Sequence, residues 1–203
     1  LQQEGIDPPN TIEELRQLAA AFTDNPDYPN TYGTAFNNVQ GSPVGQSWFE
    51  WVYNFGGKPF ESMYPGTDDP YANMTPTINS PESIAVVQFF KDMLEYQPPG
   101  ALSIQWDQRA QAFASGNVAA VPAWSVRIPS FVDPDRSSIA DEFATTLMPV
   151  KADVDRRVTP VGGWLMGMNR HGEQKDLAWD YIKWFTSADV HRAFVDAGGP
   201  PSR

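Results

Sequence analysis

An aromatic ring and a guanidinium group lie three residues apart in the segment VPAWSVR, at Trp124 and Arg127. The tryptophan offers a flat apolar face for stacking, and the arginine offers a planar fork of donors that can bind vicinal hydroxyls or a carboxylate. Small-molecule sites combine such apolar walls with a few placed polar groups. The pair therefore indicates noncovalent recognition of a ligand, although Arg127 has the alternative of a surface ion pair with Asp133 or Asp135.

A second candidate segment, SPVGQSW, lies in the loop before a predicted helix. The first turn of a helix leaves backbone N–H groups without intrahelical partners, so a loop that enters a helix can present donors to a ligand. Gln46 and Trp48 are the candidate side chains of this segment. Trp48 also belongs to an apolar helical stripe with Trp51 and Phe55, so packing in the core is its alternative role.

The segment PVGGWLMGMN places Gly162 and Gly163 directly before Trp164, in a run that otherwise suits a buried strand. Glycine weakens a strand because it has no side chain to pack and loses much backbone entropy on folding. Two interpretations account for the pair. Either the bare backbone approaches a ligand beside the Trp164 indole, or the glycines form a bulge with positive φ next to a core aromatic.

Nothing in the sequence singles out catalytic chemistry. The chain has no cysteine, which excludes disulfides, thiolate zinc sites and cysteine nucleophiles. His171 and His191, the two histidines, have no partner at metal-ligand spacing. A nucleophile elbow, a phosphate loop with its lysine and a dinucleotide fingerprint are missing as well. We therefore expect no catalytic residue, no metal and no cofactor, although the 25 acidic residues leave open an unrecognised carboxylate pair.

Charge and composition narrow the possible partners. The 203 residues carry a formal net charge of −11, which would repel phosphate backbones, so we expect no nucleic-acid partner. A hydrophobic content of 41% is enough for a core. No run reaches the roughly 18 apolar residues that a membrane span needs.

Helical and strand patterns alternate along the chain, which favours an α/β fold. The clearest helix start has Thr11 as N-cap and Glu14 as its capping-box partner, and a second has Ser80 as N-cap. The predicted helices cover residues 12–22, 48–55, 81–96, 106–115, 173–187 and 187–199. The predicted short strands cover residues 30–37, 117–124, 143–150 and 160–169.

The order of the motifs carries a resemblance to a known family. The motifs are PPNTIEEL, YNFGGKPF, NSPESIAVVQFFKDML, QAFASGNVAAVPAW, DPDRSSIA, VGGWLMGMN and KDLAWDYIKWFTSADVHRAFVDAGGPPSR. In this order and spacing the chain resembles the extracellular solute-binding proteins of ATP-binding cassette (ABC) importers, in the branch that takes up sugars and polyols. The resemblance covers nearly the whole chain, although members of that family are usually about twice as long.

The resemblance implies a two-lobed protein that closes on its ligand about a hinge. The implied fold class is α/β, a periplasmic-binding-protein-like (type II) lobe with a partial second lobe. Residues 1–157 would form the second, C-terminal lobe, and residues 158–203 the hinge crossing and part of the first lobe. On this interpretation the chain is a fragment that lacks part of the first lobe, and the signal segment for export lies outside it.

The implied function is non-catalytic binding of a sugar or polyol in an interlobe cleft and its delivery to the membrane permease subunits of an ABC transporter. We expect a monomer in the periplasm or outside the cell. Aromatic faces stack on the C–H side of a sugar, and planar polar groups bind its hydroxyls. The predicted ligand-binding residues are Gln46, Trp48, Trp124, Arg127, Gly163 and Trp164. The alternative is a carbohydrate-active enzyme domain whose aromatic residues line a subsite.

Overall fold

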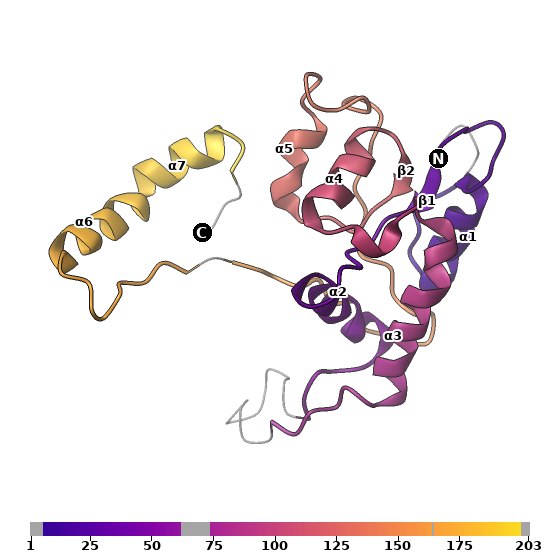
Figure 1. Cartoon of the computed structure of the whole chain (residues 1–203), viewed down its shortest axis with the longest axis horizontal. Helices are drawn as coiled ribbons and strands as arrows, with labels where there is room; N and C mark the ends of the chain where they lie inside the picture. Colours follow the sequence, from indigo (N-terminus) through magenta and orange to yellow (C-terminus); the bar gives the residue numbers. More distant parts are fainter. Residues whose placement is uncertain (1–5, 62–73, 164, 200–203) are drawn as a thin grey trace.

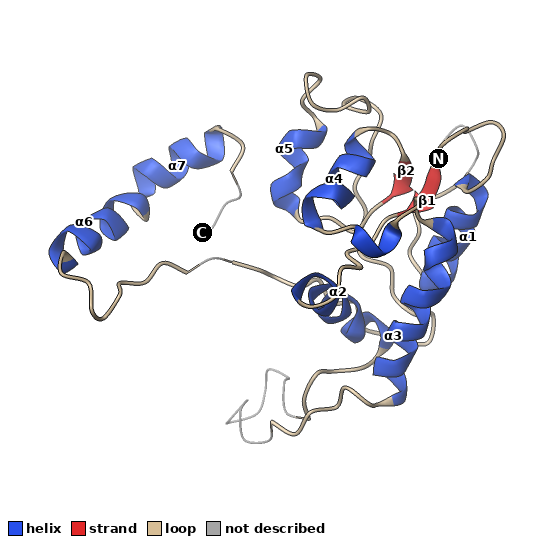
Figure 2. Ribbon diagram, viewed as in Figure 1, coloured by secondary structure: helices blue, strands red, loops and turns tan. Residues whose placement is uncertain are grey.

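The computed structural model describes residues 6–61, 74–163 and 165–199. In this part of the chain, helices surround a small parallel sheet, as Figures 1 and 2 show. The α-helices are α1 (Ile12–Phe22), α2 (Ser42–Val52), α3 (Pro81–Asp92), α4 (Trp106–Ala114), α5 (Ile128–Phe131), α6 (Lys175–Phe185) and α7 (Ala188–Asp196). The strands are β1 (Tyr32–Thr34) and β2 (Val118–Ala120), and the 3-10 helices are η2 (Tyr53–Phe55), η3 (Met93–Tyr96), η4 (Ala101–Ser103) and η5 (Ser125–Arg127).

The sheet is smaller than the sequence predicts. β1 and β2 pair in parallel, with Tyr32 opposite Val118 and Thr34 opposite Ala120. The strand predicted over residues 143–150 is wrong except at its end, where Val150 forms an isolated parallel bridge with Thr11. The described part of 160–169 is not a strand either. Both segments have the apolar content of strands, but among the described residues neither has a neighbouring strand to complete a ladder.

Helix α1 begins and packs as its sequence predicts. Thr11 accepts a hydrogen bond from the Glu14 backbone, and Glu14 reaches back to the N-cap backbone, so the capping box is complete. The apolar face of α1 is buried against β1, where the two backbones come close together at Gly33. A Cβ atom added to Gly33 would lie 2.2 Å from Ala19 Cα, so only glycine lets this helix sit so close to the strand.

The main core lies between β1, α2 and α3, and it is aromatic. Phe36, Trp51 and Phe89 are fully buried, and their ring centroids lie 5.1 to 5.7 Å apart. The helical turns through Phe55 end at Gly56, which has a φ of 81°. This end agrees with the predicted stop, because glycine adopts the left-handed conformation without a steric penalty.

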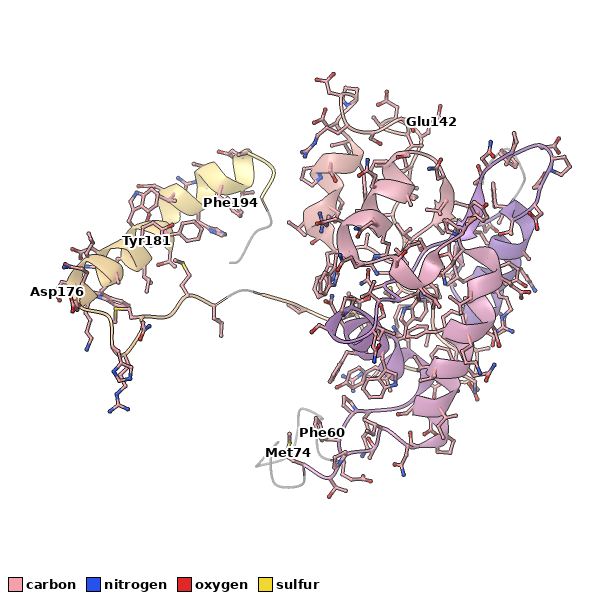
Figure 3. All side chains as sticks on the ribbon, in the orientation of Figure 1. Phe60, Met74, Glu142, Asp176, Tyr181 and Phe194 are labelled. Carbon is pink, nitrogen blue, oxygen red and sulfur yellow. The ribbon has the colours of Figure 1, made fainter. Side chains whose placement is uncertain are left out.

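Helices α6 and α7 pack on each other and lie apart from the other helices (Figure 1). They divide at Ser187, as the sequence predicts, and neither contains a buried residue. Figure 3 shows Tyr181 and Phe194 on this pair, away from residues 6–61 and 74–157, which we call the body. Large apolar side chains exposed on the pair include Leu177, Trp179, Tyr181, Trp184 and Phe194.

Candidate functional site

The predicted binding segments follow the carboxyl ends of the two strands. After β1 the chain enters α2, which carries Gln46, so the segment 42–48 is helical and the predicted loop there is wrong. After β2 the chain enters the loop that carries Trp124 and then η5, which carries Arg127. Ligands of open α/β sheets bind outside the carboxyl ends of their strands. Two short polar networks join these segments to the start of α4, so the structure brings Gln46 and Arg127 to one region of the body.

Gln46 connects α4 to the interior of α2. Its Oε1 accepts a hydrogen bond of 2.8 Å from Trp106 Nε1, and its Nε2 donates one of 2.9 Å to Glu50 Oε1. Because both ends of the amide are engaged, the orientation of the side chain is fixed. Trp106 is not among the predicted site residues. Its position beside Asp107, at the start of a predicted helix, was the sequence signal that could have suggested it.

A buried ion pair lies behind Gln46. Glu50 Oε2 is 3.7 Å from Arg109 Nη1, and the two side chains are 6% and 4% exposed. Burial lowers the pKa of the Arg109 guanidinium from its usual value, and the Glu50 carboxylate opposes that shift. Sequence reasoning missed this pair too. The only signal was a carboxylate inside the aromatic segment SWFEWV.

Arg127 forms an ion pair, but with a partner that the sequence did not suggest. Its Nη2 donates to Asp107 Oδ1 at the exposed start of α4. The expected partners Asp133 and Asp135 are therefore wrong. Asp133 Oδ1 instead accepts the backbone N–H of Asp135 within their own turn. The Arg127 fork is thus already engaged by a carboxylate in this structure.

Trp124 lines a cavity of about 590 Å³ whose other walls come from α1, β2 and the segment 144–149. Most of this lining is apolar, but Thr34, Glu50 and Trp51 also contribute to it. The Thr34 hydroxyl and the Trp51 indole N–H are buried and have no hydrogen-bond partner among the described residues. Buried polar groups are normally paired, so these two unpaired groups beside the cavity are exceptions.

The two glycines of the segment PVGGWLMGMN have different surroundings. A Cβ atom added to Gly162 would lie 2.5 Å from Cζ3 of Trp124, so bare backbone packs against this indole. Gly163 has open space around it, and its predicted ligand contact stays a prediction. Neither glycine has a positive φ, so the bulge interpretation is wrong. Trp164 lies outside the described residues.

Trp48 takes the packing role that its apolar stripe indicated. It is half-buried against the aromatic core, and its Nε1 donates a hydrogen bond of 3.4 Å to the Ser83 carbonyl. Of the predicted site residues in the described ranges, Trp124 alone lines the cavity. Gln46 reaches the cavity indirectly, through its hydrogen bond to Glu50.

None of the helices in the described part of the chain is both long enough and apolar enough to cross a membrane. Residues 6–61, 74–163 and 165–199 also contain no cluster of three or more His, Asp or Glu side chains suited to a metal ion.

Comparisons with known proteins agree with the sequence resemblance. Residues 1–192 match the family model for bacterial extracellular solute-binding proteins. Over 203 residues the chain is 26% identical to a probable amino-acid ABC transporter periplasmic-binding protein of Sinorhizobium fredii, in an alignment that covers 98% of this chain and 42% of that protein.

Solved structures agree as well. An ABC transporter solute-binding protein from Agrobacterium radiobacter K84, in complex with ribitol, is 31% identical with a TM-score of 0.85, over 100% of this chain and 48% of that one. One from Thermotoga lettingae, bound with α-D-tagatose, is 25% identical with a TM-score of 0.78, over 97% and 47%. Maltose-bound MalE3 of T. maritima, at 21% identity and a TM-score of 0.79 over 100% and 50%, shares the fold. The predicted fold class is confirmed, and the chain spans about half the length of these relatives.

Proposed function

We propose that this chain, which belongs to the bacterial extracellular solute-binding proteins, is part of a receptor that binds a sugar or polyol and delivers it to an ABC importer. The relatives described above are binding proteins of transporters rather than enzymes. Two of the similar structures hold ribitol and tagatose. Both observations support non-catalytic binding over the alternative of a carbohydrate-active enzyme.

One observation carries the proposal: an aromatic side chain and several polar side chains line the same cavity. Trp124 supplies apolar surface, and Thr34 and Trp51 supply a hydroxyl and an N–H donor that have no hydrogen-bond partner among the described residues. Glu50 supplies a carboxylate that is already bonded to Gln46 and paired with Arg109. A sugar or polyol presents both C–H surface and hydroxyls, so it satisfies both kinds of wall. An analogue without the hydroxyls would leave the polar groups unpaired, which makes such a site selective.

The charges around the cavity favour an uncharged ligand. Arg109 is paired with Glu50, and Arg127 is paired with Asp107. The described residues that line the cavity include Glu50 and Glu142 but no lysine, arginine or histidine. The lining therefore supplies no cationic side chain for the carboxylate of an amino acid, whereas a hydroxyl needs none. This charge distribution favours a polyol or sugar over the amino acid named for the Sinorhizobium relative.

The remaining predictions about the whole protein belong to the same proposal. Residues 1–157 would be most of the second lobe, and residues 158–203 the hinge crossing and part of the first. The separation of α6 and α7 from the body and their exposed apolar side chains support this division. The whole protein would be a monomer outside the cytoplasm, and its macromolecular partner would be the permease subunits of the importer.

A thermal-shift screen of the full-length protein tests this function. The panel holds ribitol, mannitol, tagatose and maltose, with amino acids and sugar acids as the charged comparison set. A ligand at 100 times its dissociation constant stabilises the folded protein by about 2.7 kcal/mol, so a true ligand gives a clear shift. We expect at least one uncharged sugar or polyol to raise the melting temperature and to be recovered unchanged. A shift with amino acids alone, or turnover of a sugar, would contradict the proposal.

A further inference from the structure

A buried asparagine binds the chain where it leaves the body. Asn54, in η2, is fully buried. Its Nδ2 donates a hydrogen bond of 2.9 Å to the Val158 carbonyl, and its Oδ1 accepts one of 2.8 Å from the Val158 N–H. A side-chain amide thus binds both backbone groups of one residue, as a neighbouring strand would. The two residues are 104 positions apart in the sequence.

The residues that follow Val158 reach the candidate site within a few steps. Thr159 and Pro160 line the cavity, and Gly162 packs against the Trp124 indole. Four residues of extended chain span at most about 14 Å, so the position of Val158 limits where Gly162 can lie. Among the described residues, we find no backbone hydrogen bond that ties 159–163 to the body. The bonds to Val158 are therefore the nearest directional anchor before the cavity.

We propose that Asn54 is a positioning residue for ligand binding. By holding Val158, it holds the segment 159–163 at the cavity and Gly162 against Trp124. Loss of the two hydrogen bonds releases this segment while the aromatic core around η2 remains packed. The fraction of molecules with an assembled site then falls, and the apparent dissociation constant rises in inverse proportion. This inference rests on the proposed function, because it concerns the same cavity.

The test compares Asn54→Leu with Asn38→Leu. Leucine has the same number of side-chain heavy atoms and the same branching as asparagine, so the first variant removes both bonds to Val158 while a side chain of similar shape stays in place. Asn38 is the matched control, because its Nδ2 donates to Gln97 Oε1 and the Ala101 carbonyl, at 2.7 and 3.0 Å, and touches nothing near residue 158. Both variants lose two partly buried hydrogen bonds, so both are expected to lower stability.

Two readouts on the full-length protein separate positioning from a merely structural role. In Asn54→Leu, hydrogen exchange at the Val158 amide rises to that of an open amide, and the dissociation constant for the best ligand of the panel, ribitol first, rises about tenfold. In Asn38→Leu, exchange at Val158 and the dissociation constant stay at wild-type values. Two results for Asn54→Leu would overturn the inference. One is faster exchange at the Val158 amide with an unchanged dissociation constant, and the other is unchanged exchange at that amide.

A second variant keeps the inference testable if leucine prevents folding. Asn54→Asp is isosteric, and its protonated carboxyl offers one donor and one acceptor, so it can make both bonds to Val158. Above its pKa the carboxylate can only accept, and the bond to the Val158 carbonyl is lost. We compare the ligand affinity of Asn54→Asp with that of wild type at each pH. The ratio of the two affinities should rise towards one as the pH falls. A ratio that does not change with pH would overturn the inference, whereas a wild-type protein that binds no sugar or polyol would overturn the proposed function instead.

Discussion

Replacing Trp124 with alanine should weaken ligand binding far more than it weakens the fold. Trp124 is half-buried, caps a short 3-10 turn and lines the cavity with its indole. Loss of an aromatic stacking contact together with its buried area costs about 1–3 kcal/mol. That range corresponds to an increase of roughly 5- to 150-fold in the dissociation constant. Trp124→Phe retains a ring and should fall between alanine and wild type.

Trp48→Ala is the matched comparison, because Trp48 is also half-buried but packs on the aromatic core. It should lower the melting temperature and leave the affinity of the folded protein nearly unchanged. Calorimetric titration gives the affinity of each variant, and thermal unfolding gives its stability. If Trp124→Ala lowers the melting temperature as much as Trp48→Ala does and leaves the affinity unchanged, Trp124 is a core residue. That result would refute its role in ligand binding.

Three further predictions concern the site and the first helix. Gly162→Val should weaken binding in calorimetry while circular dichroism stays native, because its side chain would displace the segment from Trp124; native affinity would refute this. Arg109→Met should lower the free energy of unfolding, measured in urea, by about 3–5 kcal/mol, because it leaves the buried Glu50 carboxylate without its cationic partner. A loss of less than about 1 kcal/mol would refute this. Backbone N–H groups lower the pKa of Glu14 below its usual 4.5. Glu14→Gln should therefore be less stable than wild type above pH 4.5, and the difference in stability should vanish as the pH falls through the lowered pKa. A difference in stability that does not depend on pH would refute this.

The helices could be predicted because their signals are local. Thr11 and Glu14 define one start, Ser80 another, and Gly56 an end, and each signal lies within a few residues of what it controls. The strands depend on partners elsewhere in the chain. For that reason the apolar run at 143–150 looked like a strand in the sequence, although only Val150 pairs in the structure.

Of the predicted site residues in the described ranges, Trp124 alone lines the cavity, and the contacts of the others could not be predicted from the sequence. The combination of Trp124 and Arg127 was visible in one short segment, and Gln46 in another. The contacts of Gln46 with Trp106 and of Arg127 with Asp107 join residues 60 and 20 positions apart, so no local pattern could reveal them. The resemblance to a family indicated where the site lies, and only the packing of helices and strands showed which groups meet there.

A crystal structure of the full-length protein with the best ligand from the thermal-shift screen tests the central claim most directly. We predict a sugar or polyol that rests on the Trp124 indole, with hydroxyls bonded to Thr34, Glu50 or Trp51, and with Val158 still held by Asn54. A ligand bound away from Trp124, or an amino acid in this cavity with Arg127 released from Asp107, would contradict the account.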